Sequence, residues 1–129
     1  VYIGHNTILK GYHKNEMIIG EGTWIGQQCF FHSAGGIKIG KNIGIGPGVK
    51  ILTSYHKDTN TTIPILHEEI EFKPVIIEDD SDLGVNSVIM PGVTIRRGTQ
   101  VGAGAVVTKD FPEYSIIAGV PAKLIRMRK

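Results

Sequence analysis

Apolar residues recur at every sixth position between residues 77 and 112. The recurring positions are all aliphatic: Ile77, Leu83, Ile89, Ile95, Val101 and Val107. The fourth position of each hexad is a residue type that tolerates a positive φ angle: Asp80, Asn86, Gly92, Gly98, Gly104 and Asp110. A period of six fits neither a helix nor a simple strand pleat. It is typical of a parallel β-helix, in which each hexad forms one strand and one turn, and three hexads form a coil of about 18 residues.

The same pattern extends upstream. Three hexads begin at Ile19, Ile25 and Phe31, and three more begin at Ile39, Ile45 and Ile51. All twelve first positions are apolar, although apolar residues make up only 41% of the chain. Residues 1–18 form an imperfect first coil, because the segment 9–14 fits the hexad poorly. We therefore predict an all-β fold, a parallel β-helix of about five coils, in a single domain over residues 1–129.

The repeat is interrupted once. Residues 56–74 fit no hexad, and this segment contains Pro64 and Pro74, which interrupt regular secondary structure. We predict a protruding loop here, and loops on a rigid scaffold commonly carry function. After Pro112 the chain leaves the repeat, and we expect the tail, residues 113–129, to cover the open edge of the last coil.

Composition adds limits. Cys29 is the single cysteine, so it cannot form an internal disulfide. Its place at the fifth position of a hexad predicts that it packs in the core. A protein with one unpaired thiol is more typical of the reducing cytoplasm. No apolar run approaches the roughly 20 residues of a membrane span, and no signal peptide is recognisable. The chain begins at Val1 and is already hexad-like at Ile3, so we expect an N-terminal segment to be missing.

Charge is distributed unevenly along the chain. Residues 1–95 contain seven Lys or Arg and ten Asp or Glu, whereas residues 96–129 contain seven Lys or Arg and two acids. The basic C-terminal part indicates either an anionic ligand or a solvated tail. A nucleic-acid partner is not expected, because the basic residues are not interleaved with aromatic residues and no binding motif is present.

The chain resembles the hexapeptide-repeat acyltransferases, and within them the galactoside, maltose and xenobiotic O-acetyltransferases. The resemblance covers about residues 19–129. It rests on 45–49 (Ile-Gly-Pro-Gly-Val), His56, 91–95 (Pro-Gly-Val-Thr-Ile), 102–110 (Gly-Ala-Gly-Ala-Val-Val-Thr-Lys-Asp) and 118–122 (Ala-Gly-Val-Pro-Ala). It implies a left-handed β-helix and a homotrimer that binds acetyl-CoA between neighbouring subunits.

The resemblance also implies roles for individual residues. The family's catalytic base aligns with His56. The positions that contact CoA, largely through backbone groups, align with Ala103, Thr108 and Lys109. The basic residues near the CoA phosphates align with Lys123 and Arg126. A Trp that often precedes the Leu-Gly pair is replaced by Asp82, and the acceptor-binding Asn and Asp are replaced by Gly26 and Ala34. The family's helical N-terminal segment is also lacking, so the identity of the acceptor does not transfer.

Acetyl transfer to a hydroxyl requires a base that removes the hydroxyl proton, and an imidazole suits this task near neutral pH. We expect His56 to be this base and the backbone N–H of Val85 to stabilise the oxyanion. The second ring nitrogen of His56 needs an acceptor. From its position in the loop, Glu69 is the first candidate and Glu71 the second; a backbone carbonyl would serve equally well.

The other histidines are expected to play lesser roles. His32 lies one coil below, near the same corner, and is a candidate contact for the substrate. His5, His13 and His67 are expected on the surface.

The expected function is therefore O-acetylation of a sugar or surface-glycan precursor, and N-acetylation of an amino sugar or sugar nucleotide is the alternative. Zinc carbonic anhydrases share this fold, but the five histidines lack their spacing, so no metal is expected. An ice-binding solenoid would need stacked rows of Thr, whereas outward positions here are mixed (Glu21, Gln27, Lys41).

Overall fold

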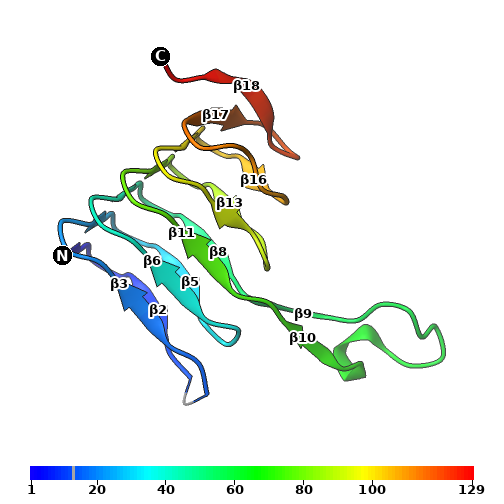
Figure 1. Cartoon of the computed structure of the whole chain (residues 1–129). Coiled ribbons are helices and arrows are strands. Elements are labelled where there is room, and N and C mark those ends of the chain that lie inside the picture. Colours follow the sequence, from blue (N-terminus) through cyan, green and yellow to red (C-terminus); the bar gives the residue numbers. More distant parts are fainter. Residues whose placement is uncertain (13) are drawn as a thin grey trace.

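Short strands joined by tight turns wind into a stack of coils, as Figure 1 shows. The computed structural model describes residues 1–12 and 14–129. The N-terminus lies at one end of the stack and the C-terminal strands lie at the other. Helical structure in the described residues is limited to the 3-10 turn η1 (Ile65–His67). None of the described residues forms a helix with the length and hydropathy needed to cross a lipid bilayer.

The strands form three faces, named A, B and C here. Face A contains β1 (Tyr2–Ile3), β4 (Trp24–Ile25), β7 (Gly44–Ile45), β12 (Asp82–Leu83), β15 (Gln100–Val101), β17 (Ser115–Ala118) and β18 (Lys123–Met127). Face B contains β2 (Ile8–Lys10), β5 (Phe30–His32), β8 (Lys50–Leu52), β13 (Val88–Ile89) and β16 (Val106–Val107). Face C contains β3 (Met17–Ile19), β6 (Ile37–Ile39), β11 (Val75–Ile77) and β14 (Thr94–Ile95). The sequence correctly predicted a parallel β-helix; face A draws strands from about six coils rather than five.

The register places the first residue of each hexad directly above its equivalent in the coil below. On face A, Ile25 pairs with Ile45, which pairs with Leu83. Of the twelve first positions, all are buried except the half-buried Ile19. One aliphatic side chain per hexad therefore fills the interior, as the pattern predicted. Cys29 is 1% exposed and packs in the same core, and burial raises the pKa of its thiol.

The turns between faces use positive φ angles at the fourth hexad position. Nine of the twelve positions have one: Gly22, Gln28, Asn42, Gly48, Asp80, Asn86, Gly92, Gly98 and Gly104. Gly48 is required for space as well, since a Cβ there would overlap the side-chain oxygen of Asn86 in the next coil. Asp110 instead uses its side chain, which accepts a hydrogen bond from the Thr94 N–H at 2.9 Å.

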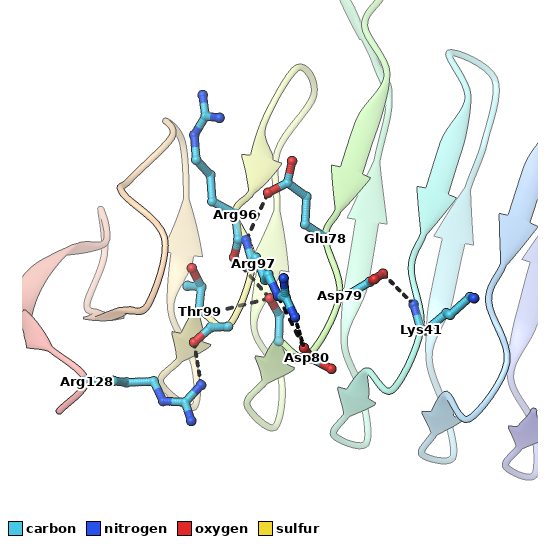
Figure 2. Close-up of polar contacts among 10 residues, drawn as sticks. Lys41, Glu78, Asp79, Asp80, Arg96, Arg97, Thr99 and Arg128 are labelled. Atoms are coloured by element: carbon cyan, nitrogen blue, oxygen red, sulfur yellow. Dashed lines mark hydrogen bonds and ion pairs between the residues drawn. The ribbon is translucent and has the colours of Figure 1, made fainter.

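Polar side chains connect successive coils at the corner between faces C and A, which Figure 2 shows in close-up. Asp79 accepts from the Lys41 N–H at 2.8 Å, and Glu78 accepts from the Arg97 N–H at 2.9 Å. The Arg97 guanidinium also donates to Asp80 at 3.2 Å. These carboxylates bind the backbone N–H groups that the turns leave free, so the corner is held by structural contacts.

The C-terminal tail covers the last coil, as predicted. β17 continues face A in parallel with β15, and β18 turns back to pair with β17 in antiparallel fashion. The turn 119–122 between them covers β16, because Val106 donates to the Gly119 carbonyl at 3.0 Å and accepts from the Ala122 N–H at 2.9 Å. The turn therefore pairs the Val106 backbone of face B, and β18 pairs β17 of face A, at this end of the stack.

A large-to-small change in the interior should destabilise the whole stack. Ile45→Ala removes a buried side chain between two neighbouring coils, so we expect the free energy of unfolding to fall by about 2–5 kcal/mol. Lys38→Ala, on the exposed surface of face C, is the matched control and should change the stability by less than about 0.5 kcal/mol. Urea denaturation followed by circular dichroism measures both. Equal effects of the two substitutions would contradict the core assignment.

Candidate active site

Three connections between faces B and C project from one corner of the stack (Figure 1). A cleft lies among them. The connections are the segment 11–16, of which residues 11, 12 and 14–16 are described, the turn 33–36 and the hairpin formed by β9 (Ser54–His56) and β10 (Ile70–Phe72). The cleft has a volume of about 660 Å³. It is lined by Tyr12, Lys14, Asn15, His32, Ala34, Ser54, His56, Ile70 and Phe72.

The predicted loop is an ordered hairpin with two different faces. β9 and β10 pair in antiparallel register, with His56 opposite Ile70 and Ser54 opposite Phe72. These four residues line the cleft. Because side chains alternate along a strand, Tyr55 and Glu71 point to the opposite side of the hairpin.

The hairpin holds the His56 ring through the backbone. His56 Nδ1 lies 3.1 Å from the carbonyl oxygen of Glu68. A carbonyl can only accept, so Nδ1 carries the proton, and in the neutral ring Nε2 presents its lone pair. The half-buried imidazole is thus fixed in the tautomer that a general base requires, with the ring lining the cleft.

The structure does not contain the expected contact between Glu69 and His56, because Glu69 binds Lys57 instead. The Glu69 carboxylate accepts a hydrogen bond from Lys57 Nζ at 3.0 Å, and the Glu71 carboxylate lies 3.7 Å from the same ammonium. The hydrogen bond with Glu69 raises the pKa of Lys57. Strand alternation places both acids on the side of the hairpin away from His56. The acceptor for His56 is the third alternative, a backbone carbonyl.

His32 lies in the same cleft as His56, as its hexad position suggested. Its Nε2 is hydrogen-bonded to the Tyr12 hydroxyl at 2.9 Å, and the two rings are 5.1 Å apart at their centroids. His5 and His67 are exposed, as expected. His13 lies outside the described residues.

Sequence reasoning missed the wall of the cleft that the segment 11–16 provides. Tyr12 and Asn15 form an isolated antiparallel bridge, and the Asn15 side-chain amide donates to the Ala34 carbonyl in the next coil. The segment is therefore a small excursion anchored on the turn 33–36. Its signal in the sequence was the poor fit of residues 9–14 to the hexad.

The residues expected to contact the acyl donor lie on three other parts of the molecule. Val85 and Ala103 are exposed in successive coils at the corner between faces A and B, where Val85 O accepts from the Gly104 N–H at 2.8 Å. Thr108 and Lys109 follow β16 at the corner between faces B and C, and both are exposed. Within one chain, face B separates Val85 from His56.

Five of the seven basic residues in the C-terminal part fall into two groups. Arg96 lies 3.7 Å from Asp110, Arg97 is paired with Asp80, and Arg128 donates to the Gly98 carbonyl at 2.8 Å. These three guanidinium groups make contacts between coils and with the tail, so their role is structural. Lys123 and Arg126 instead lie on β18, whose five residues are all exposed, and no salt bridge joins either of them to an acid in the described part of the chain.

Two further features concern the chemistry of the site. Asp82 lies on the outer surface of face A beside Gly44, and partial burial raises the pKa of its carboxyl group. Within residues 1–12 and 14–129, no group of three or more His, Cys, Asp or Glu side chains is arranged to hold a metal ion.

Known structures with the same fold include enzymes of acetyl transfer. A hexapeptide-repeat-containing acetyltransferase from Vibrio cholerae O1 biovar eltor, solved in complex with acetyl-CoA, is 30% identical with a TM-score of 0.82, over 99% of this chain and 71% of that chain. A maltose O-acetyltransferase from Clostridium difficile 630 is 28% identical with a TM-score of 0.80, over 99% of this chain and 70% of that chain.

Sequence comparisons agree. The 2,3,4,5-tetrahydropyridine-2,6-dicarboxylate N-acetyltransferase of Staphylococcus aureus is 39% identical over 87 residues, which are 67% of this chain and 31% of that protein. The chain spans less than half the length of the curated relatives that it matches. The family model described as the hexapeptide repeat of succinyl-transferase matches residues 17–52 and 74–109, the two blocks of coils on either side of the hairpin. With more than half of its residues in these repeats, the chain belongs to the hexapeptide-repeat acyltransferase family.

Proposed function

We propose that the chain is an acetyl-CoA-dependent O-acetyltransferase that acts on a hydroxyl group of a sugar or surface-glycan precursor. The observation that carries the proposal is the state of the His56 ring. Its Nδ1 is bound to the Glu68 carbonyl, so Nε2 offers a lone pair to a cleft large enough for a sugar. The acetyl-CoA complex and the maltose O-acetyltransferase among its relatives support the donor and the reaction.

In the proposed reaction, His56 Nε2 takes the proton of the acceptor hydroxyl as the oxygen attacks the thioester carbonyl carbon. The imidazolium that forms is stabilised by its Nδ1–H bond to the Glu68 carbonyl. The tetrahedral intermediate collapses by breaking its carbon–sulfur bond, and the proton passes from His56 to the leaving thiolate. The acceptor keeps the acetyl group and CoA leaves as the thiol.

The proposed oxyanion donor is the backbone N–H of Val85. Val85 occupies the second position of a β-turn, since the Gly84 carbonyl accepts from the Ser87 N–H at 3.1 Å and Asn86 has a φ of 59°. Such a type II turn leaves the N–H of its second residue outside the turn's own hydrogen bond. The side chain of Val85 is 45% exposed, so the turn lies on the molecular surface.

The positions of these groups support subunit association as part of the proposal. His56 projects from the corner between faces B and C, whereas Val85 and Ala103 lie at the corner between faces A and B. One thioester can contact both His56 and the Val85 N–H only if a second chain places its corner between faces A and B against the cleft of the first chain. We therefore propose a homotrimer with one shared site at each of its three interfaces. Thr108 and Lys109 are the further proposed contacts for CoA.

Lys123 and Arg126 are the proposed partners of the CoA phosphates. Both are cations on the exposed strand β18, without a carboxylate partner in the described structure. Phosphate oxygens accept charge-assisted hydrogen bonds from such groups. The reducing cytoplasm is the proposed compartment, in keeping with the free thiol of Cys29.

N-acetylation remains the second candidate, because a Staphylococcus aureus relative is an N-acetyltransferase. An unprotonated amine needs less activation than a hydroxyl, so the same cleft would serve both reactions. Product analysis with matched acceptors that carry only hydroxyls or an added amino group separates the two.

Replacement of the base should abolish catalysis without harming the fold. We expect His56→Ala to lower the turnover number by about 100- to 10,000-fold, since a positioned general base contributes this much. Glu69→Gln is the control on the other side of the hairpin and should retain the parent activity. Release of CoA thiol measures the rates, and size-exclusion chromatography checks assembly. Full activity of His56→Ala would refute its role.

Removal of both β18 cations should weaken donor binding. For the double variant Lys123→Ala and Arg126→Ala, we expect the KM for acetyl-CoA to rise about 10- to 100-fold with little change in turnover number, because charge-assisted hydrogen bonds are lost. Lys41→Ala, at the corner between faces C and A, is the control with an unchanged KM. An unaltered KM in the double variant would assign these cations another role.

A further inference from the structure

We infer that the acceptor is an anionic sugar, held between the segment 11–16 and the β9–β10 hairpin by Tyr12, Lys14, His32 and Phe72. This inference rests on the proposed function, since it specifies the substrate class of the same cleft. The four residues come from the segment 11–16, the end of strand β5 and the β9–β10 hairpin at one corner of the stack, and all of them line the cleft together with His56.

Aromatic rings supply the walls. Tyr12 belongs to the segment 11–16 and is 37% exposed, and Phe72 belongs to β10 and is 56% exposed. Tyr12 is steadied by its hydroxyl contact with His32, whose ring also lies 6.0 Å from that of Phe30. Ile70 extends the apolar lining on the hairpin side. Flat apolar faces with polar groups at their edges suit a sugar ring, which has C–H groups on its faces and hydroxyls around its rim.

Several polar groups of the lining can donate hydrogen bonds. The ammonium of Lys14 can only donate. If the Tyr12 hydroxyl donates to His32 Nε2, the ring proton of His32 resides on Nδ1, which then donates as well. The Asn15 amide nitrogen is already bound to the Ala34 carbonyl. A ligand that matches this set is rich in acceptor oxygens.

The charge of the cleft has one sign. Among its nine described lining residues, Lys14 is the only lysine or arginine, and none is a carboxylate. No acid of the nearby hairpin belongs to this lining: one oxygen of Glu68 accepts from the Asn60 N–H at 3.2 Å while its other oxygen is buried without a partner among the described residues, and Glu69 and Glu71 bind Lys57. Nothing in the described lining would neutralise a cationic acceptor, whereas a phosphate or a carboxylate would find a cation and hydrogen-bond donors.

Matched sugars test this inference. Glucose, galactose and mannose are each compared with the corresponding 6-phosphate and uronic acid, and dissociation constants are measured by titration calorimetry on the parent chain. We expect at least one charged sugar to bind about tenfold or more tightly than its neutral counterpart. The phosphate and uronate arms identify which anion is preferred.

Variants of Lys14 link the preference to the cleft. Lys14→Ala should bring the affinity for the charged sugar down to that for the neutral one, and Lys14→Glu should lower it further. Lys38→Ala, which removes a lysine from the surface of face C, should leave the preference intact. Equal binding of charged and neutral sugars, binding of no sugar in the panel, or a preference that survives Lys14→Glu would each overturn the inference.

The outcomes for the reaction are separate. Transfer to a neutral hexose without any charge preference would keep the proposed function and remove the anionic subsite. A Lys14-dependent preference without release of CoA thiol from acetyl-CoA would keep the subsite and remove the proposed function.

Discussion

The constraint on which this structure depends is that every coil must return in register above the last one. The backbone of each strand bonds to the strand above and below, and one aliphatic side chain per hexad fills the narrow interior. An extra residue within a coil would move every later side chain to another face. Additional chain can therefore be accommodated only at a corner and only by projecting outward. Both walls of the cleft, the segment 11–16 and the β9–β10 hairpin, are such projections from the same corner.

The repeat was readable because the first hexad position points inward in every coil. The buried aliphatic positions and most of the turns followed directly from it, and so did the single large interruption and the covering role of the tail. The exceptions have local causes. Gln28 adopts a positive φ although glutamine is not a residue type that favours one. The Asp110 carboxylate instead accepts a hydrogen bond from the coil below.

The site was harder to predict, because its geometry does not follow the six-residue period. Inside the hairpin the period changes to two, which places His56 and Phe72 on the cleft side and Glu69 on the other. The acceptor for His56 is a main-chain carbonyl. Every residue has such a carbonyl, so this partner cannot be recognised from the amino-acid sequence. Tyr12 lies in a segment whose only signal was its failure to fit the repeat. In the proposed trimer, the spatial relation of Val85 to His56 would depend on contacts between chains, which no single sequence pattern encodes.

The central claim is that one chain supplies His56 and its neighbour supplies the N–H of Val85. A complementation experiment tests it most directly. Val85→Pro removes this N–H at a turn position that Pro47 already occupies in the coil below, so the fold should tolerate it. His56→Ala and Val85→Pro chains, each inactive alone, are unfolded together and reassembled in equal amounts. If sites are shared, about one quarter of them combine both intact groups in random trimers, and activity should return to that extent. Mixed trimers that stay inactive would contradict the account, as would full activity of Val85→Pro alone.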